Sequence, residues 1–259
     1  MRWPTLIVAG AQKCGTTTLA RVLARHPQVF MSKPKELHYF DSNWNRGEEW
    51  YLDHFDEKLD VVHWGEASPS YMFRQVARER MRELVPDVRL VVILRDPTSR
   101  AYSHYWHNVR RGEEQLGTFV EALEAEEART GPGSRPVAQR RFSYTARGRY
   151  LEQLQVLEKN HGRDNLHVML LEDLRDRPVD SLVDLFGYLG VDTDQAERLQ
   201  VKRANAYRQK QEDGSVVAAE YERIDPGVKA HLHERFAEDN DRLAAWLGRD
   251  LSHWNDPTH

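Results

Sequence analysis

The chain opens on a short apolar run that gives way, after a small polar loop, to a helical pattern. Leu6 to Ala9 are apolar and partly β-branched, and from Gly15 onward Leu19, Val22 and Leu23 recur on one helical face. This pattern predicts a strand, a tight loop and a helix N-terminus in succession. Such a junction points unpaired backbone N–H groups and the positive end of a helix dipole at one spot, where an anion is the natural ligand.

Apolar strands alternate with helical patterns along the rest of the chain. We expect further strands at 61–69, 89–94 and 166–171, with a short extended piece at 29–31. The helical patterns cover 46–54, 71–84, 113–129, 150–159, 181–189 and 226–254. No linker or internal repeat divides the chain. The sequence therefore predicts one three-layer α/β domain over residues 1–259, with a central parallel sheet flanked by helices.

The first loop resembles a nucleotide-triphosphate P-loop but departs from it in one respect. Gly10 and Gly15 have the four-residue spacing of that motif, yet two threonines stand where its lysine and Ser/Thr should follow. The only lysine of the loop, Lys13, lies inside it. A loop that keeps the anion cradle and relocates the lysine indicates a 5′-phosphate ligand whose terminal group differs from a magnesium-bound triphosphate.

Composition and charge narrow the function classes. The 259 residues are 40% hydrophobic and 30% charged, with a net charge of -4, so no global basic field favours nucleic acid and any anion site must be local. The longest apolar run, Leu90 to Leu94, is far shorter than a membrane span. Met1 to Pro4 lead straight into the first strand without a signal-like segment. We therefore expect a cytoplasmic protein.

The single cysteine, Cys14, lies in the first loop. It can form no internal disulfide, and nothing in the sequence resembles a zinc framework, so no metal site is expected. A catalytic thiol and a small residue filling a tight loop are both open interpretations. The second is favoured because no thiol-activating partner is identifiable.

A second candidate phosphate site follows the strand at 89–94. Pro97 suits the first position of a helix with Asp96 as its cap, which places Arg95 at the carboxyl edge of the sheet and Ser103 about two turns along the helix. An arginine fork and a hydroxyl suit a phosphate dianion. The alternative is structural: Arg95 paired with Asp96, and Ser103 merely helical.

Three stretches together resemble a known family: Gln12 to Thr17, Gly65 to Tyr71, and Leu94 to Ser103. They are similar to sulfotransferases that use 3′-phosphoadenosine 5′-phosphosulfate, closer to the bacterial and heparan-sulfate-type branch than to the cytosolic phenol and steroid enzymes. The resemblance implies that the first loop binds the 5′-phosphosulfate and that Arg95 and Ser103 bind the 3′-phosphate. The implied donor site comprises Gln12, Lys13, Cys14, Gly15, Thr16, Thr17, Thr18, Arg95 and Ser103. Lys13 would stabilise the leaving phosphate without a metal.

Two residues compete for the role of catalytic base. Glu66 resembles the family's catalytic glutamate in motif and position, and it needs a raised pKa to work at neutral pH. Its alternative role is to pair with a loop arginine. His38 has a suitable ordinary pKa, but the favoured interpretation of His38 is packing beside Tyr39 and Phe40 in a loop over 33–41.

The chain departs from the heparan-type pattern in two places. Ala67 stands where those enzymes commonly have a lysine, and the cysteine-bracketed loop that closes over the donor is absent, which leaves Lys202, Arg203 and Arg208 as the nearest candidates. The predicted function is sulfuryl transfer to a hydroxyl, less readily an amine, of a small-molecule or carbohydrate acceptor. The alternatives are a P-loop-type nucleotide or small-molecule kinase and a non-catalytic nucleotide-binding protein. The acceptor's identity and the oligomeric state stay open.

Overall fold

The described part of the chain forms two compact units. The computed structural model describes residues 2–55, 60–199, 201, 208–210, 216–218 and 222–256. Unit 1 comprises residues 1–95 and 153–205, and unit 2 comprises residues 96–152 and 206–259. Helix α8 (Tyr150–His161) crosses from one to the other. The expectation of a single domain over the whole chain stays a prediction.

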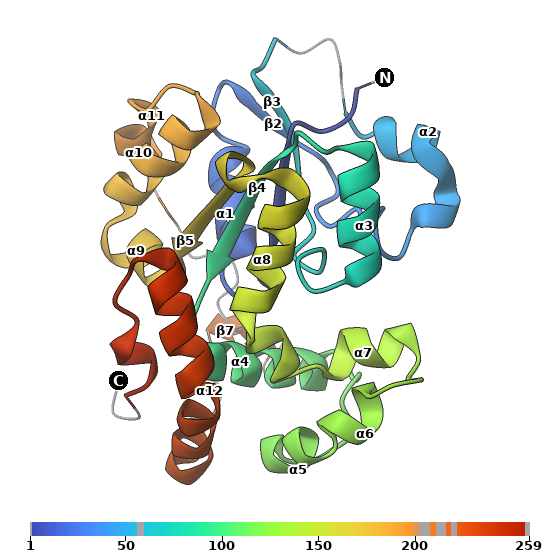
Figure 1. Cartoon of the computed structure of the whole chain (residues 1–259), viewed down its shortest axis with the longest axis vertical. Coiled ribbons are helices and arrows are strands. Elements are labelled where there is room, and N and C mark those ends of the chain that lie inside the picture. The colour runs from blue at the N-terminus through green and yellow to red at the C-terminus, as the bar shows by residue number, and fades with distance from the viewer. Residues whose placement is uncertain are drawn as a thin grey trace. The chain divides into compact units, whose positions relative to one another are not determined.

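Unit 1 is built on a five-stranded sheet (Figure 1). Its strands are β1 (Leu6–Gly10), β2 (Val29–Met31), β3 (His63–Ala67), β4 (Arg89–Leu94) and β5 (Leu166–Leu170). They lie in the order β2-β3-β1-β4-β5, and every neighbouring pair is parallel. The predicted central parallel sheet is confirmed. All five strands end at one edge, the edge where ligands of open α/β sheets bind.

Helices flank this sheet. Those of unit 1 are α1 (Thr16–Leu23), α2 (Gly47–Leu52), α3 (Gln75–Leu84), α9 (Leu171–Asp176), α10 (Pro178–Leu189) and α11 (Gln195–Arg198), with 3-10 turns at Trp44–Arg46 and Arg163–Asn165. Helix α1 packs against β1, β2 and β3 through its buried Leu19, Val22 and Leu23, as its apolar face predicts. Helix α3 begins later than expected because Tyr71 and Met72 lie buried in a turn, where the Met72 N–H donates to Ala9 O.

The described elements of unit 2 are mainly helical. They are α4 (Pro97–Arg110), α5 (Phe119–Glu124), α6 (Glu126–Thr130), α7 (Pro136–Phe142) and α12 (Pro226–Leu247), with 3-10 turns at Ala146–Gly148 and Ser252–Trp254 and an antiparallel ribbon of β6 (Arg208–Lys210) and β7 (Val216–Ala218). Asp96 caps α4 as predicted, accepting from the N–H groups of Thr98 and Ser99. Helix α12 ends at Leu247, earlier than expected, because Gly248 adopts a left-handed conformation.

The helix predicted over 113–129 is wrong at its start and interrupted at Ala125, since helices cover Phe119–Glu124 and Glu126–Thr130 only, and the late start is due to one buried carboxylate. Glu114 accepts from the N–H groups of Gln115 and Leu116, which holds this segment out of a helix. The same carboxylate takes a bidentate pair from Arg129 and a hydrogen bond from the hydroxyl of Tyr144. The first helix of the region therefore begins only at Phe119.

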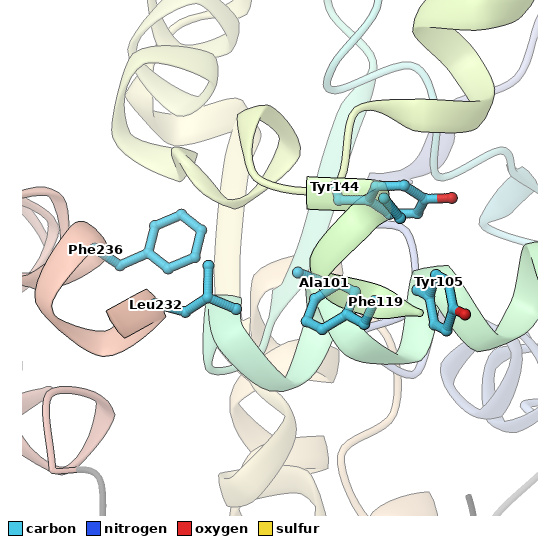
Figure 2. Packing of buried hydrophobic residues seen from close by; sticks show 7 residues of the cluster. Ala101, Tyr105, Phe119, Tyr144, Leu232 and Phe236 are labelled. Atoms are coloured by element: carbon cyan, nitrogen blue, oxygen red, sulfur yellow. The ribbon is translucent and has the colours of Figure 1, made fainter. Parts of the chain in front are cut away.

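One aromatic cluster forms the core of unit 2 (Figure 2). Its buried members are Ala101, Tyr105, Phe119, Ala122, Tyr144, Leu232 and Phe236. They come from α4, α5, the segment before Ala146–Gly148, and α12, so the cluster joins segments that are far apart in sequence. Burial of these aromatic and aliphatic side chains stabilises the packing of the helices that carry them.

Candidate functional site

The loop between β1 and α1 has the geometry of an anion cradle. Gly15 is the N-cap of α1 in a left-handed conformation, φ 94°, and no side chain caps the helix. The N-terminus of a helix points its first N–H groups and the positive end of its dipole at one place, which is a setting that suits an anion. A Cβ on Gly15 would lie 2.7 Å from Cδ1 of Leu171, so a larger residue there needs both a left-handed backbone and a shift of that side chain. Lys13, inside the loop, is also left-handed at φ 72°.

The predicted loop residues lie together at the carboxyl edge of β1. Gln12, Lys13, Thr17 and Thr18 are half-buried, whereas Thr16 is buried. Hydroxyl and amide groups in such a loop add donors to the backbone N–H groups of the cradle.

Cys14 is fully buried, and its thiol donates to the carbonyl oxygen of Gln12 at 3.8 Å. A reactive thiol needs partial exposure and an electropositive setting. The burial of Cys14 therefore supports the interpretation that it fills the loop.

Glu66 lies in β3 beneath three hydroxyl groups. Oε1 accepts from Tyr51 at 2.6 Å and from Tyr71 at 3.1 Å, and Oε2 accepts from Ser68 at 2.7 Å. The four side chains are fully or almost fully buried. Burial raises the pKa of Glu66, more than the hydrogen bonds from the three hydroxyls lower it. The raised pKa expected of a base is present, but the carboxylate has no exposed surface for an acceptor to reach.

The loop after β2 carries a chain of charged groups at the same edge of the sheet. His38 Nδ1 lies 3.1 Å from Asp41 Oδ1, and His38 Nε2 lies 3.5 Å from Glu36 Oε2. Ser70 donates to Asp41 Oδ2 at 2.6 Å, and Lys35 donates to Glu36 at 2.5 Å. Among these groups Glu36 has the most exposed side chain, with 41% of its surface open to solvent even though it binds Lys35 and His38.

These contacts decide the charge of His38. Burial lowers its pKa, but the hydrogen bonds and charges of Asp41 and Glu36 outweigh burial and raise the pKa to about 9. Burial would raise the pKa of Glu36, yet His38 and Lys35 lower it to about 2. The pKa of Asp41 is lowered too, because the interactions with His38 outweigh its burial. An imidazolium cannot accept a proton, which argues against His38 as the base at neutral pH.

The phosphate-site candidates elsewhere are placed as follows. Arg95 is half-buried directly after β4, at the carboxyl edge of the sheet of unit 1. Ser103 is buried in α4 of unit 2. Arg203 lies outside the described residues, and Arg208 is the first residue of β6, whose side chains are not described. A joint role of Arg95 and Ser103 stays a prediction.

The aromatic side chains expected in the loop pack in two layers. Tyr39 and Phe40 are buried, and Tyr39 stacks on Tyr51 with ring centroids 4.3 Å apart. Trp44 and Trp50 are half-buried. Arg80 lies 4.2 Å from the Trp44 ring centre, and Arg46 lies 4.0 Å from that of Trp50. The inner rings are therefore core, and each of the outer two carries an arginine over one face.

Across the described ranges, no group of three or more His, Cys, Asp and Glu side chains is arranged to hold a metal ion. No helix in the part of the chain that the structure covers is long and apolar enough to cross a membrane.

Comparison with known proteins decides the family. The sulfotransferase domain family matches residues 4–236, which is most of the chain. The chain belongs to the sulfotransferase domain family. A sulfotransferase from Alicyclobacillus acidocaldarius is 30% identical, and the alignment covers 99% of this chain and 100% of that one with a TM-score of 0.80.

Other sulfotransferases match over shorter stretches. Human bifunctional heparan sulfate N-deacetylase/N-sulfotransferase 3 is 37% identical over 114 residues, 41% of this chain and 13% of that protein. This chain thus matches a small part of such relatives. Mouse sulfotransferase SULT7A1 complexed with PAP shares the fold, with a TM-score of 0.50 and 17% identity over 76% of this chain and 64% of that one.

The sequence interpretation missed the partners of its own candidates. Glu36 and Asp41 lie two and three residues from His38, and their acidic spacing around a histidine was the available signal. The sequence contains less indication of the hydroxyl partners of Glu66. Ser68 follows it closely in sequence, but Tyr51 reaches it from another element, which only the fold reveals.

Proposed function

We propose that this sulfotransferase moves the sulfuryl group of 3′-phosphoadenosine 5′-phosphosulfate to a hydroxyl, less readily an amine, of a small-molecule or carbohydrate acceptor. The main support is the uncapped start of α1 behind a loop that carries Lys13. A sulfuryl group carries less charge than a terminal phosphoryl group and needs no magnesium, so backbone N–H groups and one lysine form a suitable set of ligands for it. The PAP in the mouse neighbour of the same fold agrees with this donor.

Transfer by in-line displacement needs little covalent chemistry from the protein. The bond between sulfur and the bridging oxygen breaks while the acceptor oxygen bonds to sulfur, and charge develops on the leaving 5′-phosphate. Lys13 and the N–H groups at the start of α1 stabilise that charge. A carboxylate takes the acceptor proton late in the reaction, as a carboxylate does in phosphoryl transfer by kinases.

Glu36 is the carboxylate that the geometry favours as the base. Its N–H donates to the carbonyl oxygen of Ala67 at 3.1 Å, so it lies at the carboxyl end of β3. Ala67 pairs with Val8 of β1, the strand that leads into the Lys13 loop. Glu36 is ionised over the physiological range, and an acceptor that excludes water raises the pKa of the carboxylate toward a useful value. Glu66 stays the rival, buried under its three hydroxyls.

The donor is tested by thermal shift with matched ligands. We expect 3′,5′-adenosine bisphosphate to raise the Tm well above the effect of ATP with magnesium, since a ligand that binds only the native state stabilises it. Adenosine 5′-monophosphate serves as the control that lacks the 3′-phosphate. Stronger stabilisation by ATP with magnesium would replace the proposal with a kinase.

Transfer itself is measured by mass spectrometry of acceptor panels with the phosphosulfate donor. Hydroxylated aromatics and glucosamine-containing oligosaccharides represent the two acceptor classes. The half-buried rings of Trp44 and Trp50 favour planar or sugar rings, which stack on aromatic faces. Addition of the mass of one sulfuryl group to any of these acceptors supports the proposal, and donor hydrolysis without such a product counts against it.

A further inference from the structure

We propose that Glu66 is a positioning residue whose carboxylate orients two hydroxyl groups, and that these hydroxyls fix the loop carrying Glu36 and His38. The inference rests on the proposed sulfuryl transfer, because the candidate base lies in that loop. It gives Glu66 a contribution to the reaction without contact with the acceptor.

The two hydroxyls each join the carboxylate to a peptide group of the loop. Ser68 donates its proton to Glu66 Oε2 at 2.7 Å, and its oxygen accepts from the N–H of His38 at 3.3 Å. Tyr71 donates to Glu66 Oε1 at 3.1 Å, and its oxygen accepts from the N–H of Phe40 at 3.4 Å. A hydroxyl has one proton. Because Ser68 and Tyr71 each donate that proton to the carboxylate, their oxygens present lone pairs to the N–H groups of the loop.

The loop needs such fixing because its backbone is strained. Glu36 has φ 66° and His38 has φ 53°, a region that residues other than glycine rarely adopt. Strained conformations persist only where the surroundings over-determine them. The bond from the Glu36 N–H to Ala67 O holds the start of the strained segment, and the bonds from the N–H groups of His38 and Phe40 hold its end.

A carboxylate does this better than its isosteric amide. Glu66 accepts three hydrogen bonds and donates none when ionised, which matches three hydroxyls that all point their protons at it. An amide at the same place brings two protons of its own, so at least one hydroxyl must turn away. In a buried site a turned or unpaired hydroxyl is costly, and its oxygen no longer accepts from the loop as before.

Tyr51 provides a matched control inside the same cluster. Its hydroxyl donates to Glu66 Oε1 at 2.6 Å, but among the hydrogen bonds of the described residues it reaches no peptide group of the loop. Tyr51→Phe therefore removes one partner of the carboxylate and keeps both links to His38 and Phe40. Ser68→Ala with Tyr71→Phe does the opposite, since it removes both links and leaves the carboxylate in place.

The test measures amide hydrogen exchange and steady-state kinetics in the full chain. In Glu66→Gln we expect faster exchange at the amides of His38 and Phe40, about 10²-fold lower kcat, and unchanged affinity for 3′,5′-adenosine bisphosphate. The variant with both Ser68→Ala and Tyr71→Phe should lose kcat to a similar extent. Tyr51→Phe should leave exchange at the two amides near the wild-type rate and lose much less kcat.

The outcomes separate three cases. Slow exchange at the amides of His38 and Phe40 in Glu66→Gln would overturn the inference. An inactive Glu66→Gln beside a nearly fully active double variant would overturn it too, because Glu66 would then act on the acceptor directly. If Glu66→Gln does not fold, the single variants Ser68→Ala and Tyr71→Phe decide by the same exchange measurement. If the wild-type chain shows no sulfuryl transfer, the proposed function is wrong. The exchange measurement would still test whether Glu66 fixes the loop, because it does not depend on activity.

Discussion

His38 and Asp41 form an ion pair at the edge of the sheet, with Nδ1 of the ring 3.1 Å from a carboxylate oxygen. The remaining ring nitrogen faces Glu36, so the imidazolium lies between two carboxylates. This arrangement converts a histidine into a permanent cation at neutral pH, and it makes the loop sensitive to pH on both sides.

The His38 pKa can be measured directly by NMR titration. We expect a value of about 9 in the wild type and a fall toward the ordinary 6.5 in Asp41→Asn, because the neutral amide no longer favours the charged ring. Asp53→Asn, at an exposed position, is the control. A wild-type value near 6.5 would contradict the ion pair.

Stability and activity should follow this titration. The folded-state pKa of His38 is raised, so its stabilisation is fully present below pH 6.5 and is lost as the pH rises through about 9. The folded-state pKa of Glu36 is lowered, so its stabilisation is present above 4.5 and is lost as the pH falls toward about 2. We expect kcat to fall as the pH rises through about 9, where His38 loses its charge. A flat kcat through pH 9 to 10, measured in about 0.1 M salt, would show that the charge on His38 is not needed.

Glu36→Gln should abolish transfer and spare donor binding. The amide cannot take the acceptor proton, and the loss of a general base costs about 10²- to 10⁴-fold in rate. Exposed Glu49→Gln is the control for a change of one charge. Full activity of Glu36→Gln in a steady-state assay would return the base to Glu66.

Lys13→Ala should lower kcat more than it weakens product binding. In the proposed mechanism the lysine acts on charge that develops on the leaving phosphate, and loss of one such donor costs about 10²- to 10³-fold in kcat. Lys159→Ala, at an exposed position of α8, removes a comparable charge elsewhere. Equal losses in kcat and in affinity for the bisphosphate would place Lys13 in ground-state binding instead.

Arg95→Ala should weaken 3′,5′-adenosine bisphosphate much more than adenosine 5′-monophosphate. A charge-assisted hydrogen bond contributes about 1.5–3 kcal/mol, which is a factor of roughly 10 or more in Kd. Calorimetric titration of both nucleotides checks this difference. Parallel losses for the two ligands would remove Arg95 from the 3′-phosphate site.

Gly15→Ala separates backbone strain from steric overlap. A left-handed alanine costs about 1–2 kcal/mol, and here the new Cβ would also meet Leu171 at 2.7 Å. Gly190 is left-handed as well, with nothing within 4 Å, so Gly190→Ala shows the cost of conformation alone. Urea unfolding should give the larger loss of stability for Gly15→Ala, and equal losses would show that Leu171 moves aside freely.

The parts of the fold with strong local patterns could be predicted from sequence. The apolar runs of β1 and β4 and the face of α1 were sufficient to indicate the parallel sheet and the anion cradle. The region after α4 could not be predicted, because Glu114 binds Arg129 and Tyr144 from distant positions and overrides helix propensity. The partners of Glu66 were hidden for the same reason, since Tyr51 comes from a different element.

Three residues other than glycine have positive φ in the described chain, namely Lys13, Glu36 and His38, and all belong to the two loops of the candidate site. Glycine would relax the backbone at these positions and remove the side chain to which the proposed mechanism gives a role. At Lys13 in particular, we expect the substitution that best suits the conformation to abolish activity. If variants are selected for thermal stability alone, without regard to activity, we expect glycine to be selected at position 13. That result would show that natural selection has kept function at this position at the expense of stability.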